Sequence, residues 1–228
     1  MRRLHSVLIA AAAVVSFASF ASAADMPVKA QRAVLPYNWT GWYAGVSAGG
    51  DWGNINGSFP VAATVYSHTT SGWNLGAHIG YQYQWSQWVL GGEVGASALG
   101  TKGSSICPDG VSTCSEKGRA LFEAAAKFGW AWDRALLYGK AGWGGEQIKS
   151  TVVPPFPGYD DSQLMSGLLL GAGLEYAVWQ NWTVGVEYIH VNLASKGYGP
   201  SPFVLAVSRN ISGNDNLVRA VLNYRFGG

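Results

Sequence analysis

After its first 23 residues the sequence lacks any long apolar run. The longest candidate, residues 168–178, is interrupted by Gly171, Gly173 and Glu175. A transmembrane helix needs about 20 consecutive apolar residues, so this part of the sequence does not predict a helical membrane span. If this part enters a membrane, it must do so as a closed β-barrel, because lipid cannot hydrogen-bond an exposed backbone.

The N-terminal residues predict a secretory signal peptide over residues 1–23. Arg2 and Arg3 precede an apolar run at residues 7–20, and a small-residue Ala-Ser-Ala site follows at residues 21–23. An uncleaved membrane anchor is the alternative. Residues 24–41 contain two prolines and no alternation, and we expect them to form a periplasmic lead-in before a domain at residues 42–228.

The sequence also lacks an excess of charge of one sign. Removing Arg2 and Arg3 with the signal from the 15 basic residues leaves 13, equal to the 13 acidic residues. Proteins that bind nucleic acid present a basic patch, so this composition predicts no nucleic-acid partner.

Cysteine is scarce, and the two residues present, Cys107 and Cys114, lie in the Gly- and Ser-containing segment 103–118. An even number in an exported chain predicts a disulfide, which here would close a short loop and act locally. A metal or redox pair is the alternative. It is disfavoured because the spacing is not CxxC and no histidine lies nearby in the sequence.

Catalytic motifs are missing as well. The chain has four histidines and no H-E-x-x-H motif. His68 with Ser71, or Asp160 with Asp161, could be imagined as reactive groups at an external rim, but no triad supports them. We therefore expect no enzymatic activity, no cofactor and no metal site.

What the sequence does contain is alternation of apolar with small or polar residues, the period of a β-strand. The clearest case is residues 73–84, where the apolar positions include Trp73, Ile79 and Tyr83. The eight predicted strands cover residues 42–52, 73–84, 88–98, 120–132, 135–144, 164–178, 182–192 and 217–226. Together they predict an all-β fold, an eight-stranded antiparallel transmembrane up-and-down β-barrel.

The connections between these strands alternate in length. Three short turns are predicted at residues 85–87, 133–134 and 179–181. Four long loops are predicted at residues 54–71, 103–118, 147–162 and 194–214. Short periplasmic turns and long external loops are typical of outer-membrane barrels.

Aromatic residues gather at the ends of the predicted strands. Those expected at the rim with the short turns are Trp42, Trp85, Trp88, Trp130, Trp132, Trp179, Trp182 and Phe226. Trp52, Trp73 and Trp143 are expected at the other rim. The two sets predict aromatic girdles at the two membrane interfaces; ordinary core aromatics are the alternative.

The charged residues of the predicted strands alternate with the apolar ones, so their side chains are expected to point into the barrel. They are Asp51, Glu93, Glu123, Lys127, Lys140, Glu175, Glu187, Arg219 and Arg225. An eight-stranded barrel is just wide enough for side chains to fill it, so this lumen charge network predicts a structural plug. A narrow polar passage or gated pore is the alternative. A soluble lipocalin-like barrel would need an apolar interior, and these charges argue against it.

Two end segments carry a family resemblance. Residues 37–45 read YNWTGWYAG, and residues 216–226 read NLVRAVLNYRF. Together they resemble the small porin-like outer-membrane β-barrel proteins of the RopB type. The resemblance implies insertion by the outer-membrane assembly machinery, contact with outer-membrane lipid and lipopolysaccharide, and a role in envelope integrity.

We therefore expect a non-enzymatic protein of the bacterial cell outer membrane that supports the envelope and presents four surface loops. A small passive porin-like channel is one alternative. A loop-mediated adhesin or ligand-binding surface protein is the other.

Overall fold

The computed structural model describes residues 37–59, 64–107, 111, 113–153, 159–198 and 209–226. The predicted signal peptide and residues 24–36 of the predicted lead-in lie outside these residues. Within them, no helix is long and apolar enough to cross a membrane. The strands are β1 (Gly41–Phe59), β2 (Thr64–Trp85), β3 (Trp88–Leu99), β4 (Lys102–Ile106), β5 (Thr113–Trp132), β6 (Ala135–Val153), β7 (Tyr159–Ala177), β8 (Trp182–Tyr198) and β9 (Arg209–Phe226).

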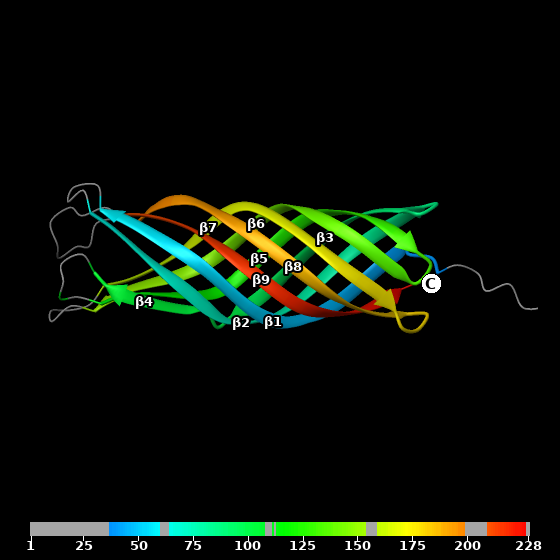
Figure 1. Cartoon of the computed structure of the whole chain (residues 1–228), viewed down its shortest axis with the longest axis horizontal. Helices are drawn as coiled ribbons and strands as arrows, with labels where there is room; N and C mark the ends of the chain where they lie inside the picture. The colour runs from blue at the N-terminus through cyan, green and yellow to red at the C-terminus, as the bar shows by residue number, and fades with distance from the viewer. Residues whose placement is uncertain are drawn as a thin grey trace, which may run out of the picture. The chain divides into compact units, whose positions relative to one another are not determined.

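The strands other than β4 form a closed antiparallel ring (Figure 1). Each pairs with its neighbours in chain order, and β1 pairs with both β2 and β9, which closes the ring. A closed ring leaves no free sheet edge, since every strand has a partner on both sides. The predicted eight-stranded up-and-down barrel is confirmed.

Strand β4 continues the line of β3 after a break at Gly100 and Thr101. Asn74 pairs with Leu99 and Ser71 pairs with Lys102, so β2 keeps one register along both strands. The break is where the indole of Trp73 lies against the backbone: a Cβ at residue 100 would be 2.1 Å from Trp73 Nε1. Glycine is therefore required at residue 100. Because β3 and β4 follow one another along β2, they together occupy one strand position in the barrel.

The four predicted long loops are too long. Much of residues 54–71, 103–118, 147–162 and 194–214 is strand, because β1, β2 and β5–β9 extend well beyond the predicted ends and β4 was not predicted. The extensions are rich in Ser, Thr, Asn and Gly. A strand with water rather than lipid outside it needs no apolar face, so its backbone ladder continues where the hydrophobic alternation stops.

The short turns agree closely with the sequence. Trp85 pairs directly with Trp88, and Trp132 with Ala135, which leaves two-residue turns at Ser86–Gln87 and Asp133–Arg134. Ser86 (φ 56°) and Asp133 (φ 48°) adopt the left-handed region that tight hairpins require.

The two faces of the wall differ sharply in composition. Leu137 and Trp143 lie outside at 48% and 42% exposure, whereas Tyr138 lies inside at 3%. The interior also contains an apolar cluster on the loop side of the central charges, formed by Ile55, Leu99, Leu121, Ile148, Met165, Leu169, Ile189, Val191, Leu193, Ile211 and Leu217. The interior therefore has an apolar part beside the predicted charge network, and inward-facing residues such as Leu121 and Leu169 supply it.

Candidate functional site

The centre of the barrel interior is an ion-pair cluster around Lys140 of β6. Its Nζ lies 2.6 Å from Glu93 Oε1, 2.9 Å from Glu187 Oε1 and 3.8 Å from Glu123 Oε1. These four side chains come from four strands and are almost completely buried. Buried charges are stable only when they are closely paired, and Lys140 meets this condition with three carboxylates.

Arg219 of β9 completes this central cluster. Its guanidinium lies 2.7 Å from Glu123 Oε1 and 3.2 Å from Glu187 Oε1. Two tyrosines satisfy further carboxylate oxygens: the Tyr43 hydroxyl donates to Glu93 Oε2 at 2.7 Å, and the Tyr138 hydroxyl donates to Glu187 Oε2 at 3.0 Å.

A second ion pair lies nearer the turn end. Lys127 contacts Glu175, and the Thr183 hydroxyl donates to the other oxygen of Glu175 at 3.2 Å. The Lys127 ammonium also lies 3.6 Å from the centre of the Tyr138 ring, a cation–π contact. The tyrosines therefore connect this pair to the central cluster.

Two of the nine predicted network residues lie apart from these ion pairs. Asp51 accepts a hydrogen bond from Thr101 on the loop side of the cluster. Arg225 donates to Gln82 Oε1 at 2.9 Å and to the backbone oxygen of Trp39 at the turn end. The structure thus joins Glu93, Glu123, Lys127, Lys140, Glu175, Glu187 and Arg219 in close ion pairs, and places Asp51 and Arg225 at the two margins.

Trp39 closes the turn end of the interior, a role that the sequence analysis missed. Its side chain is fully buried, and its indole N–H donates to the Asp133 carbonyl at 3.1 Å. The Trp39 backbone N–H donates to Gln84 Oε1 at 2.7 Å. Trp39 belongs to the segment predicted as a periplasmic lead-in, but here residues 37–40 fold back onto the barrel. The lack of alternation around Trp39 gave no signal for this.

Two carboxylates lie among the residues of the apolar cluster, with Ile148 and Ile211 on their loop side. Glu146 and Asp215 are both about 4% exposed and line a cavity of about 10 Å³, room for about one water molecule. Both lie on the loop side of the strand segments between the two sets of aromatic residues. Burial, with Asp51 nearby, raises the pKa of Asp215 to about 7. Burial and Asp215 raise the pKa of Glu146 as well.

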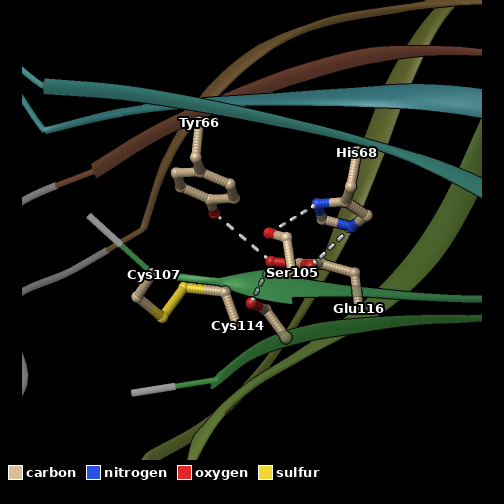
Figure 2. Close-up of a disulfide and its surroundings, with 7 residues drawn as sticks. Tyr66, His68, Ser105, Cys107, Cys114 and Glu116 are labelled. Atoms are coloured by element: carbon tan, nitrogen blue, oxygen red, sulfur yellow. Dashed lines mark hydrogen bonds and ion pairs between the residues drawn. A yellow bond between two sulfur atoms is a disulfide. The ribbon is translucent and has the colours of Figure 1, made fainter. Parts of the chain in front are cut away.

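The loop end of the interior is capped by the disulfide and a polar cluster beside it (Figure 2). The predicted Cys107–Cys114 disulfide is present and packs with Tyr66. His68 Nε2 lies 2.9 Å from Glu116 Oε2, and the Tyr66 hydroxyl donates to Glu116 Oε1 at 3.3 Å. These contacts join β2 to β5 at this end.

The imagined catalytic pairs do not form a site. His68 points inward to Glu116, whereas Ser71 is exposed on the outer face. Asp161 accepts a hydrogen bond from Gln163 at 2.9 Å, and the side chain of Asp160 lies outside the described residues. Among the residues that the structure describes, no three His, Cys, Asp or Glu side chains are grouped to hold a metal ion.

The eight aromatic residues expected at the rim with the short turns all lie at or near that end of the strands. Trp130 is half-buried and packs edge-on against Trp88, with 4.5 Å between the ring centroids. The other seven side chains of this set, including Trp88, are exposed. Trp52, Trp73 and Trp143 are exposed outward, further along the strands towards the loop end. The apolar outer surface lies between the two sets.

The family model of the outer membrane protein beta-barrel domain matches residues 9–226. The chain belongs to this outer-membrane β-barrel family. It is 34% identical over 207 residues to the 25 kDa outer-membrane immunogenic protein of Brucella abortus, covering 87% of this chain and 89% of that protein. It is 29% identical over 251 residues to the 31 kDa outer-membrane immunogenic protein of Brucella melitensis, covering 98% and 100%. The predicted outer-membrane location is confirmed.

Solved structures of outer-membrane barrels share the fold of this family member. OprG from Pseudomonas aeruginosa matches with a TM-score of 0.57 at 11% identity, covering 84% of this chain and 99% of that one. The protease OmpT from Escherichia coli matches with a TM-score of 0.53, also at 11% identity, covering 85% and 99%. At this identity the likeness concerns the fold alone.

Proposed function

We propose that the protein is a non-enzymatic, non-conducting barrel that supports the envelope and presents long hairpins outside the cell. The proposal rests on the filled interior. Seven buried charged side chains from six strands form close ion pairs at its centre. Trp39 covers the turn end and the apolar cluster fills the loop side. Such a packed interior favours a rigid plug over a water-filled passage.

Surface presentation is supported by the strand extensions beyond the outer tryptophans. They raise the hairpin ends above the apolar band, and the disulfide with the His68–Glu116 pair braces one of them. The Brucella relatives are named immunogenic proteins, which fits hairpins that face the medium. The turn end then lies in the periplasm and the exposed aromatic residues lie at the two membrane interfaces.

Ion conductance in a planar bilayer tests the plug. We expect the refolded protein to insert without producing current steps. Insertion is checked by the mobility difference between unheated and boiled samples of the recovered protein. Steady, reproducible steps would contradict the plug and favour a small passive channel.

Labelling with a membrane-impermeant maleimide in intact cells tests the orientation separately. The described residues hold no free cysteine that would react. Ser67 is exposed near the loop end and Gln180 is exposed at a turn. We expect Ser67→Cys to be labelled and Gln180→Cys to be labelled only after permeabilisation. The reverse pattern would overturn the proposed orientation.

A further inference from the structure

The outer surface near the loop end carries basic side chains in a single row across three strands. Lys102 of β4 lies directly opposite Lys117 of β5, and Lys117 lies opposite Lys149 of β6. Lys102 and Lys117 are exposed, whereas Thr101 and Glu116 beside them point inward and are buried. The alternation of a strand therefore turns both lysines to the outside.

A bulge adds Arg119 to this surface. The β5–β6 register passes from Gly118 opposite Ile148 to Ala120 opposite Gln147, which leaves Arg119 without a register partner. Arg119 is exposed, between the inward-facing Gly118 and the half-buried Ala120. A bulge redirects a side chain without ending the pairing, and here it places a guanidinium beside Lys117.

We define Lys102, Lys117 and Arg119 as the basic cluster. Within the described residues none of the three makes an ion pair or side-chain hydrogen bond. Lys149 is left out of the cluster, because it is half-buried and already takes part in an interaction. Like charges directly opposite each other destabilise a sheet, so the Lys102–Lys117 pair is unfavourable unless an anion neutralises it.

The acids closest in sequence cannot do so. Glu116 of β5 and Glu146 of β6 point inward and are almost completely buried. Glu116 is already held by His68 and Tyr66. Among the residues that the structure describes, no acid contacts the basic cluster, and an anion from outside the chain can neutralise it.

The height of the cluster on the wall indicates which anion is available. The exposed indole of Trp73 lies at the level of Gly100, whose N–H donates to the Trp73 carbonyl at 2.8 Å. Lys102 follows two residues later towards the loop end, about 7 Å along the strand. Tryptophan marks the headgroup level of a membrane, so the cluster lies in the outer part of the headgroup layer.

We propose that the basic cluster binds the phosphate groups of a phosphorylated glycolipid in the outer leaflet. Lysine and arginine make strong charge-assisted hydrogen bonds to phosphate, and arginine can do so with two parallel donors. A lipid phosphate held at the wall neutralises the basic cluster just beyond the apolar band. This inference rests on the orientation given under the proposed function.

Native mass spectrometry of the full-length folded protein, with lipid A as the probe, tests the site. The protein is refolded in neutral detergent and titrated with diphosphoryl lipid A or with lipid A lacking both phosphates. We compare the wild type with the triple variant Lys102→Gln, Lys117→Gln, Arg119→Gln. We expect the triple variant to lose at least about tenfold in affinity for the diphosphoryl lipid, and both proteins to bind the dephosphorylated lipid equally weakly.

Lys196→Gln is the matched control, because Lys196 is another exposed lysine, on β8. It should bind the diphosphoryl lipid like the wild type. Unchanged binding in the triple variant, or an equal loss in Lys196→Gln, would overturn the site. Competition by inorganic phosphate at the concentration of the lipid would show free-anion rather than lipid recognition and would also overturn it. Each variant is first shown to fold by its unheated gel mobility. Binding in micelles does not depend on conductance or on orientation in the cell, so this test can fail separately from the proposed function.

Discussion

Lys140 and Glu93 form an ion pair through the lumen, 2.6 Å from Nζ to Oε1, although β6 and β3 do not neighbour each other in the sheet. Strand β5 lies between them. The contact therefore links parts of the wall that share no backbone ladder. Lys140 also pairs with Glu187 of β8, so a single ammonium group links β3, β6 and β8 across the interior.

Replacing Lys140 by Met should destabilise the barrel strongly. The change leaves Glu93 and Glu187 buried with one cation fewer, and breaking a buried pair in this way costs about 3–5 kcal/mol. The free energy of unfolding in urea, measured in lipid vesicles, gives the result. Lys196→Met changes an exposed lysine and should have little effect. Equal stability of the two variants would mean that the interior tolerates an unpaired carboxylate.

Replacing Leu170 by Arg should impair insertion. Leu170 of β7 lies on the outer face at 46% exposure, within the apolar band. An arginine at the middle of the bilayer costs about 2–4 kcal/mol. The amount of heat-modifiable protein in the outer-membrane fraction is measured, with Leu170→Ala as the control. A wild-type amount of the Leu170→Arg variant would mean that this face does not contact lipid.

The sequence predicts the part of the fold that lipid constrains. Between the aromatic rims one face must be apolar, so alternation locates the eight strands and places Glu93 and Lys140 on one side. Beyond the rims this constraint ends, and the strand extensions leave no hydrophobic pattern. The predicted loops were too long for that reason.

Contacts between residues far apart in the sequence could not be predicted. Parity places Glu123 and Arg219 inside but cannot show that they touch, since this depends on the stagger of the strands around the ring. The same limit hides Glu146 and Asp215, which fall just outside the predicted strands. It also hides the outer lysine row, which appears only once β4 is aligned with β5.

Replacing Trp39 by Ala should destabilise the turn end. The Trp39 side chain is fully buried, and truncating a buried tryptophan costs about 3–5 kcal/mol. Trp42 is three residues away but 57% exposed on the outer face, which makes Trp42→Ala a matched control in detergent. We expect the urea midpoint to fall much further for Trp39→Ala. A larger loss in Trp42→Ala would contradict the role of Trp39 as the closure of this end.

The stability of the loop side should depend on pH through Asp215. Its pKa is about 7 in the folded protein, raised by burial and by Asp51, against an ordinary value of 3.8. The folded state therefore binds this proton more tightly than the unfolded state does. The resulting stabilisation is complete below about pH 4 and is lost as the pH rises towards 7. Glu146 contributes in the same direction.

Asp215→Asn removes this titration while keeping the size of the side chain. The wild-type urea midpoint should decrease between pH 4 and pH 8, and that of Asp215→Asn should decrease less and be the higher of the two at pH 8. Asp161→Asn is the control, because Asp161 is half-buried near the loop end and should follow the wild-type profile. Identical profiles for Asp215→Asn and the wild type would show that Asp215 is ionised in the folded protein throughout this range, and that the acids beside the small cavity are better solvated than their burial indicates.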